Sequence, residues 1–177
     1  MTDAHVVDTN VLIVASAADD GSPFQPDATP IEEAQLRQQV LNWLMAFEQD
    51  PQRHLVLDYH WLIAGEYQNK LSEQNYGWLA IMAKHDKGQV IWVGFELDDA
   101  GDAILKEPLA SAVTDRADRK MVAAVLEAQQ QGHSCHLVNA CDTDWLDCEA
   151  ALNSAGIEVQ HLLREWILAA HANKHRK

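Results

Sequence analysis

Short apolar runs alternate along the chain with stretches whose apolar residues recur at helical spacing, and this alternation is the strongest constraint on the fold. The runs lie at His5–Val7, His54–Leu57, Val90–Val93, His136–Val138 and Ile157–Val159. No hairpin dipeptide such as Asn-Gly joins one run directly to the next, which argues against antiparallel hairpins. Strand–helix alternation favours a parallel sheet covered by helices on both faces. We therefore expect a single α/β domain over residues 1–177, without internal repeats or linkers.

The segments between the runs carry start and stop residues typical of helices. The clearest helix is expected to begin at Thr114 or Asp115 and to end at Gly132. Another should begin near Pro30, because proline suits the first helical turn. Further helices are expected at Val11–Ala15, Ile63–Leu71, Trp78–Ala83, shortly before Ala155, and at Leu162–Ala170. Residues 17–30 and 96–102 have the composition of loops.

The charge of the chain limits its partners. Thirteen Lys and Arg face 27 Asp and Glu, so the formal net charge is −14. Such an acidic surface argues against broad non-specific DNA binding, which depends on basic side chains neutralising phosphates. The acids are either spread over a solvated surface or gathered to hold a divalent cation, which could itself receive a phosphate.

The sequence also carries expectations about the compartment. No apolar run approaches the ~18 residues of a membrane span, and the first ten residues lack the basic and apolar regions of a secretory signal. The chain has three cysteines, an odd number. A reduced, cytoplasmic setting without membrane contact is the simplest interpretation.

Several acids lie where strands end or helices begin. Asp8 follows the first apolar run, Asp142 follows the fourth, and Asp118 lies in the first turn of the clearest helix. Ligands of open parallel sheets bind beyond the carboxyl ends of the strands. Glu66, on a helix just past another strand end, can face the same crevice. Four converging carboxylates repel one another unless a cation lies between them, and Mg²⁺ or Mn²⁺ prefers such oxygen ligands.

Each acid also has a simpler structural interpretation. Aspartate is a preferred helix N-cap, worth about 1 kcal/mol, and acids in a first turn are favoured by the helix dipole. Cap or first-turn roles fit Asp8, Asp115, Asp118, Asp142 and Asp144. Glu66 taken alone is typical of a solvated helix residue. Composition and spacing leave both interpretations open.

Four segments, in the same order, resemble the motifs of PIN domains, the PilT N-terminus family of nucleases. In Val6–Ile13 the triplet Asp-Thr-Asn follows an apolar strand, and residues 56–67 place a helical Glu after the second strand. In residues 114–128 an Asp opens an alanine-rich helix, and in residues 138–159 an Asp-x-Asp-aromatic sequence follows a strand. Together the matches span nearly the whole chain.

The resemblance implies a Rossmann-like three-layer sandwich with a central parallel sheet of about five strands. It implies a metal-dependent endoribonuclease whose catalytic, metal-binding residues are Asp8, Glu66, Asp118 and Asp142. Asp115 and Asp144 are alternates, because the third and fourth motifs each hold two acids. Thr9 and Asn10 match polar residues of the first motif and would steady Asp8 or its water.

The implied chemistry is hydrolysis of an RNA phosphodiester. Mg²⁺ or Mn²⁺ would lower the pKa of a bound water, and a carboxylate would accept its proton. Arg116, Arg119 and Lys120 flank Asp118 and could contact the RNA backbone, although such a run also fits a solvated helix face. A toxin of this type would have an antitoxin as partner, and apolar helix surface offers room for another protein or a homodimer. The alternative is a PIN-like protein-interaction module with a weak or lost site.

Two other groups of metal-ligand residue types receive a structural interpretation. Cys135, Cys141 and Cys148 lack Cys-x-x-Cys spacing, so hydrophobic burial is expected. His171 and His175 lie four residues apart, but no Glu follows the first His, and the zinc-protease pattern therefore fails. We expect these two histidines to lie in a frayed terminus.

Overall fold

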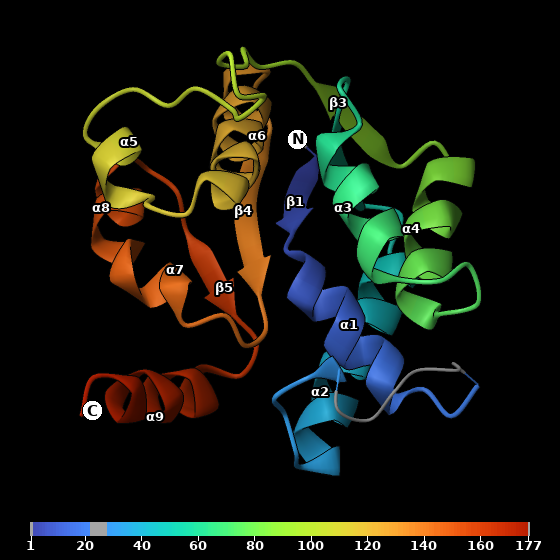
Figure 1. Cartoon of the computed structure of the whole chain (residues 1–177). Coiled ribbons are helices and arrows are strands. Elements are labelled where there is room, and N and C mark those ends of the chain that lie inside the picture. The colour runs from blue at the N-terminus through green and yellow to red at the C-terminus, as the bar shows by residue number, and fades with distance from the viewer. Residues whose placement is uncertain (1, 22–27, 177) are drawn as a thin grey trace.

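The computed structural model describes residues 2–21 and 28–176 (Figure 1). At its centre lies one sheet of five strands, all parallel, in the order β3-β2-β1-β4-β5. The strands are β1 (Asp3–Val7), β2 (Arg53–Asp58), β3 (Val90–Val93), β4 (Ser134–Asn139) and β5 (Val159–His161). The predicted α/β class, with a parallel sheet of about five strands flanked by helices, is thus confirmed.

The strand order reverses next to β1. The chain moves outward from β1 to β2 and β3, then returns to place β4 on the other side of β1. β1 and β4 pair in register from Asp3 opposite Ser134 to Val7 opposite Val138. Their carboxyl ends therefore lie side by side at the reversal, where open α/β sheets form a crevice.

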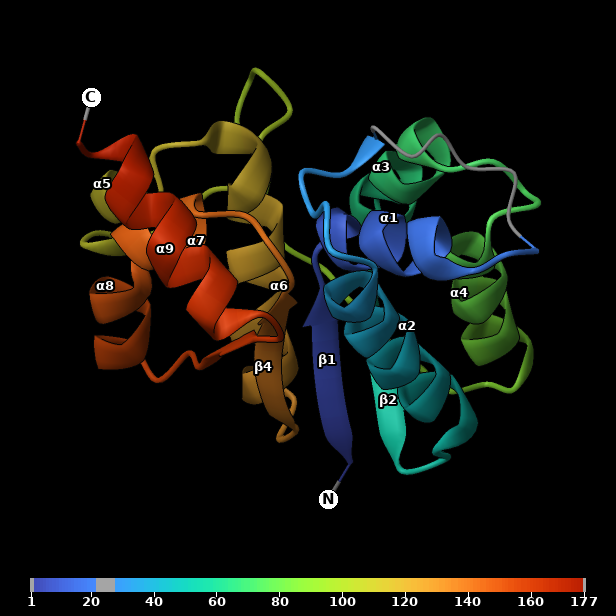
Figure 2. The same ribbon diagram turned by 90° about the horizontal axis from the view of Figure 1, so that it is seen from below.

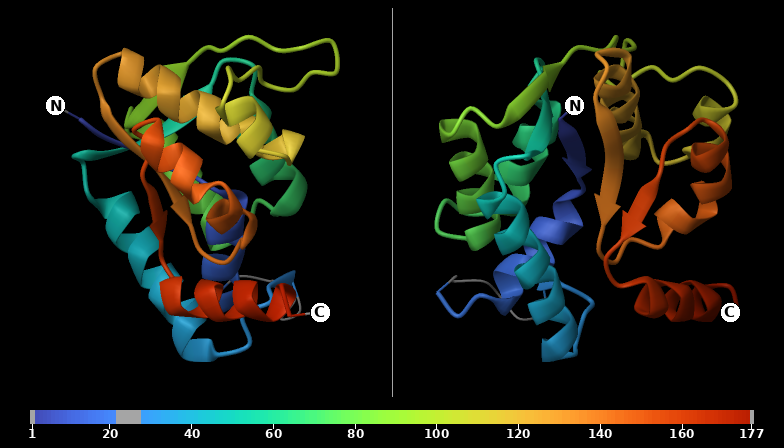
Figure 3. Two further views of the ribbon diagram at one scale, coloured as in Figure 1. Left: turned by 90° about the vertical axis from the view of Figure 1, so that its left-hand side faces the viewer. Right: turned by 180° about the vertical axis from the view of Figure 1, so that it is seen from behind.

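Helices cover both faces of this sheet. They are α1 (Thr9–Ala18), α2 (Ala34–Gln49), α3 (Leu62–Lys70), α4 (Tyr76–Asp86), α5 (Leu109–Ala112), α6 (Arg119–Gln130), α7 (Asp144–Asp147), α8 (Glu149–Ser154) and α9 (Arg164–Lys174). α1, α2 and α4 contact one another, whereas α6 contacts β1, β2, β3 and β4. The left view of Figure 3 shows α2 and α6 on opposite sides of the strands.

The core follows from this three-layer arrangement. Val6, Val7, Leu137 and Val138 on the two central strands are fully buried, as expected for parallel strands covered on both faces. All three cysteines are buried and free, which confirms the expectation for them. Burial raises the pKa of Cys135, Cys141 and Cys148 to about 12, so their thiols stay neutral.

Several element boundaries differ from the sequence-based expectation. α2 begins at Ala34 and not near Pro30, because residue Ile31 is buried and its carbonyl accepts a hydrogen bond from Arg37. The helix expected from Thr114 or Asp115 is divided: a 3₁₀ turn, Arg116–Asp118, precedes α6. The last strand lies two residues later than expected, since the Ile157 N–H bonds to a carbonyl of α8.

The carboxyl-terminal helix is also longer than predicted. α9 reaches Lys174, and the His175 N–H still donates to the His171 carbonyl at 3.2 Å. The expectation of a frayed terminus at these histidines was therefore wrong.

Two regions remain. The centre of the loop predicted at 17–30, residues 22–27, lies outside the described residues. In the predicted 96–102 turn, an isolated bridge joins Leu97 to Ala103. No helix among residues 2–21 and 28–176 is long and apolar enough to cross a membrane.

Candidate metal centre

Asp8 lies at the end of β1 and is the most enclosed acid of the candidate site. Its side chain is 7% exposed. It caps α1, as Oδ1 accepts from the Asn10 N–H at 3.4 Å, and its Oδ2 accepts from Trp145 Nε1 at 2.5 Å. The capping interpretation of Asp8 is therefore correct, and it does not exclude a ligand role, since cap geometry leaves carboxylate lone pairs free.

Asp118 and Asp142 approach Asp8 from two other segments. Each of the three residues offers a carboxylate oxygen, and these oxygens all lie within 4.8 Å of one another. Asp142 follows β4, and its Oδ1 accepts from the Asp144 N–H at 2.9 Å. Asp118 ends the 3₁₀ turn that leads into α6. We call Asp8, Asp118 and Asp142 the acidic triad.

The surroundings of the acidic triad favour protonated carboxyl groups. Burial, reinforced by the charges of Asp142 and Glu66, raises the pKa of Asp8 to about 7, although the hydrogen bond from Trp145 opposes the rise. Burial and the charges of Asp8 and Asp142 raise the pKa of Asp118 to about 8. Burial also raises the pKa of Asp142. A divalent cation between the three carboxylates would remove this penalty.

The chemistry of the donor set fits a hard cation. The triad presents oxygen ligands, which Mg²⁺ and Mn²⁺ prefer. Ligand oxygens around an octahedral Mg²⁺ lie about 3 Å apart at ~2.1 Å bond lengths. The triad oxygens lie within 4.8 Å of one another, so binding would draw the three carboxylates closer together.

A second acidic group shares Asp118 with the triad. Asp115, Asp118 and Asp144 also bring one carboxylate oxygen each within 4.8 Å of the others. Asp115 caps the 3₁₀ turn by accepting from the Ala117 N–H at 2.9 Å, and Asp144 pairs with Lys174 at 3.1 Å. The two alternates therefore lie next to the triad, and both already have partners.

Glu66 lies near the triad but outside it. Its charge acts on Asp8, yet its Oε1 accepts from Lys120 Nζ at 3.0 Å and its Oε2 accepts from the Thr9 hydroxyl. Lys120, predicted as an RNA contact, is largely buried in this ion pair. The negative charge of Glu66, the fourth expected ligand, is thus already compensated by the ammonium group of Lys120.

The polar residues after Asp8 brace the site in a way that the sequence did not indicate. Thr9 holds Glu66 and does not contact Asp8 through its hydroxyl. Asn10 accepts at Oδ1 from the N–H groups of Ala140 and Cys141 at 2.8 and 3.1 Å, and its Nδ2 donates to Asn139 Oδ1 at 2.9 Å. Asn10 therefore ties the end of β1 to the turn that carries Asp142.

The two predicted arginines occupy different environments. Arg119 donates to the Val113 and Ala110 carbonyls at 3.1 and 2.8 Å, so its guanidinium holds the segment around α5. Arg116 is 66% exposed, and its guanidinium lies 3.8 Å from the carboxylate of Asp102. Of the two, Arg116 is the one accessible to a phosphate.

Sequence reasoning missed two residues that shape the site. Trp145 is fully buried and donates to Asp8, and the aromatic position after Asp-x-Asp was the available signal. Tyr67 donates from its hydroxyl to the Val7 carbonyl at 2.5 Å, directly before Asp8. Nothing in the sequence pattern distinguished Tyr67 from an ordinary core residue.

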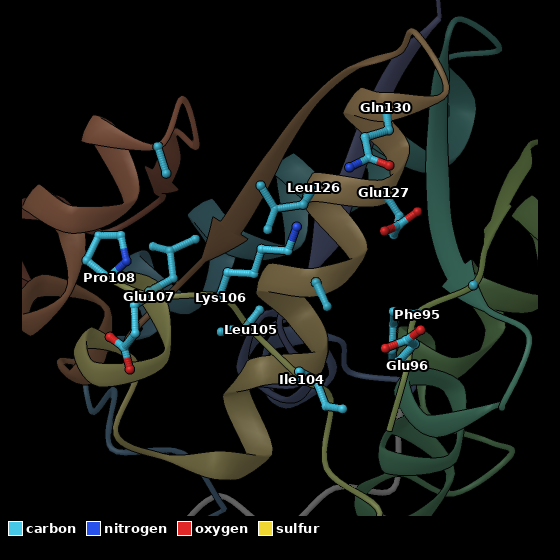
Figure 4. A pocket seen from close by; sticks show the side chains of 14 residues that line it. Phe95, Glu96, Ile104, Leu105, Lys106, Glu107, Pro108, Leu126, Glu127 and Gln130 are labelled. Carbon is cyan, nitrogen blue, oxygen red and sulfur yellow. The ribbon is translucent and has the colours of Figure 1, made fainter. Parts of the chain in front are cut away.

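A cavity of about 710 Å³ lies elsewhere, between α6 and the segment of residues 94–109 (Figure 4). Its walls include Phe95, Leu105 and Leu126, with Glu96 and Glu127 beside them. None of the six predicted acids lines it. The candidate metal centre is instead the group of buried and partly buried carboxylates at the strand ends.

Comparisons with protein-family models, with curated proteins and with solved structures give no match to this chain. The fold and the geometry of the site therefore carry the functional argument.

Proposed function

We propose that the chain is a divalent-metal-dependent endoribonuclease of PIN-like type that hydrolyses RNA phosphodiester bonds. The observation that best supports this is the convergence of Asp8, Asp118 and Asp142, with ligand oxygens within 4.8 Å, beside the reversal of strand order. Burial and repulsion from neighbouring carboxylates raise the pKa values of the three carboxyl groups. Binding of a cation would relieve that repulsion and is therefore favoured.

The triad would hold Mg²⁺ or Mn²⁺. Such an ion supplies a bound water of lowered pKa and neutralises phosphate oxygens in the transition state. Trp145 orients Asp8 through its 2.5 Å hydrogen bond. Glu66, which is 26% exposed and is held by Lys120 and Thr9, can accept a proton from a water.

Fewer residues support the proposed binding of a substrate than support the binding of a metal. Arg116, exposed at the edge of the acidic groups, is the proposed phosphate contact. An RNA substrate is proposed from the resemblance of the four segments to PIN domain motifs. The antitoxin, the homodimer and the cytoplasmic location stay predictions.

The test is cleavage of single-stranded and structured RNAs with Mg²⁺, Mn²⁺ or EDTA. We expect cleavage with metal, none with EDTA, and loss in Asp8→Asn and Asp118→Asn. The matched control is Asp99→Asn, which removes an exposed carboxylate outside the site. Equal cleavage by wild type and Asp8→Asn would reject the proposal.

One observation favours the second candidate, a protein-interaction module with a weak site. Glu66 is already neutralised by Lys120 and held by Thr9, which leaves one ligand fewer for a cation. Metal binding without cleavage of any RNA, by a folded protein, would favour this function.

A further inference from the structure

The end of α9 brings two histidines against a carboxylate of α7. His171 and His175 are four residues apart and so share one face of the helix. His171 Nε2 lies 2.7 Å from Asp147 Oδ1, and His175 Nε2 lies 3.1 Å from His171 Nε2 and 3.7 Å from the same Oδ1. Figure 2 shows α9 running past α7. This group shares no residue with the acidic triad.

Protons satisfy both short contacts only if one N–H of His171 is shared between Asp147 and an unprotonated His175, and every two-centre arrangement leaves a mismatch. If His171 Nε2 carries a proton for Asp147, that nitrogen has no lone pair to accept from His175. If His175 donates to His171, the bare His171 nitrogen faces a carboxylate oxygen at 2.7 Å. If both nitrogens are protonated, two N–H groups oppose each other at 3.1 Å. A metal ion would accept a lone pair from each of the three atoms, which lie within 3.7 Å of one another.

We propose that Asp147, His171 and His175 form a binding site for a transition-metal dication, with Zn²⁺ as the ion that fits best. Zinc binds histidine nitrogen and carboxylate oxygen at about 2.0–2.2 Å, which places tetrahedral ligand atoms about 3.3 Å apart. The three separations, 2.7, 3.1 and 3.7 Å, bracket that value. A water completes the fourth position, since the three side chains are 28–58% exposed.

The ligand types separate this site from the acidic triad. Imidazole nitrogen favours zinc, copper or nickel, whereas carboxylate oxygen alone favours magnesium or manganese. Lys174, on the same helix, does not compete, because its ammonium group is paired with Asp144 at 3.1 Å. The site therefore stands whether or not the chain cleaves RNA.

Metal at this site would join the last turn of α9 to α7. Both histidines belong to α9, whereas Asp147 ends α7, which begins at Asp144. A shared ion adds to the Lys174–Asp144 pair in holding the carboxyl-terminal helix against the segment that follows Asp142. We expect slower amide hydrogen exchange in the last turn of α9 when Zn²⁺ is bound.

The experiment titrates ZnCl₂ by calorimetry and CoCl₂ by its visible absorption into the full chain without a histidine tag. The background carries Asp8→Asn and Asp118→Asn, so that the triad does not contribute. We expect one ion per chain, a tetrahedral Co²⁺ spectrum, and at least about tenfold weaker binding after His171→Ala or His175→Ala, since removing even an outer partner of a metal ligand costs about 10–100-fold.

The matched control is His85→Ala, which removes an exposed histidine that faces the single carboxylate of Asp86 at 3.4 Å. The Zn²⁺ affinity of this variant should equal that of the protein that carries only Asp8→Asn and Asp118→Asn. Imidazole ¹⁵N spectra provide a second measurement: Zn²⁺ should shift the Nε2 resonances of His171 and His175 and leave those of His85 unchanged. Binding that stays within twofold in both histidine variants, or no bound ion in the background protein, would overturn the proposal.

Discussion

Replacing Asp8 by asparagine should stabilise the metal-free protein and abolish its stabilisation by metal. Burial raises the pKa of Asp8 from the ordinary 3.8 to about 7. Between these values the unfolded chain has lost the proton while the folded chain keeps it, so the free energy of unfolding falls as pH rises. The loss begins near pH 4 and is complete above pH 7.

The magnitude follows from that interval. Raising the pKa from 3.8 to about 7, at about 1.4 kcal/mol per pH unit, removes about 4 kcal/mol of stability by pH 8. Asparagine has no charge to bury, and its amide oxygen can still accept the hydrogen bond from Trp145. In EDTA at pH 8 we therefore expect Asp8→Asn to be more stable than the wild type by up to about 4 kcal/mol, and at pH 5 by only about 1–2 kcal/mol.

Metal should remove this difference. An ion at 1,000 times its dissociation constant stabilises the wild type by about 4.1 kcal/mol, which offsets the advantage of Asp8→Asn at pH 8, whereas the variant should gain little. Urea unfolding at pH 5 and pH 8, with EDTA or Mn²⁺, measures all four conditions, with Asp99→Asn as the control. Wild-type stability above that of Asp8→Asn in EDTA at pH 8, or equal gains with Mn²⁺, would refute the reasoning.

Four further substitutions test the supports of the site and the helix packing. Trp145→Phe removes the Nε1–H that donates to Asp8, so Mn²⁺ affinity measured by calorimetry should fall about 10–100-fold; unchanged affinity would contradict an orienting role. Asn10→Ala strands two backbone N–H groups after β4 and should cost about 1–3 kcal/mol in urea unfolding. Gly77→Ala would place a Cβ 2.7 Å from a carbonyl oxygen of α1 and should cost about 1–3 kcal/mol. Gly65→Ala, whose Cβ would meet no atom closer than 3.9 Å, should instead stabilise α3 by about 0.5–1 kcal/mol, and equal effects of the two glycine changes would show that packing does not decide them.

The sheet was predictable because its strands are buried on both faces. Runs such as Leu55–Leu57 are continuously apolar and are separated by helical patterns, so the alternation alone indicates parallel strands. Boundaries were harder to predict, since local contacts decide them. The break before α6 depends on the cap that Asp115 makes with Ala117, and a helical pattern contains no sign of such a 3₁₀ turn.

The parallel sheet also made the proximity of the acids predictable. The ion pairs that these acids form with basic side chains were not predictable. Asp8 and Asp142 follow neighbouring strands, which places them together once the sheet is known. The Glu66–Lys120 pair joins α3 to α6, two helices that are far apart in sequence. Periodicity shows which face of a helix is buried but does not show which side chain lies opposite. The function of these acids stays a prediction that cleavage and binding experiments decide.

The distribution of basic groups decides what the acidic surface can attract. Lys84 is fully buried and donates to two carbonyls and Gln89. Lys120 is paired with Glu66, and Arg119 is held by two carbonyls. Since these three basic side chains serve the fold, they do little to attract phosphates at the surface, and the net charge of −14 opposes an RNA chain. The same charge raises the local concentration of divalent cations around the acidic triad. If RNA binds there, a bound cation must therefore supply most of the attraction for its phosphates, because the protein surface supplies little.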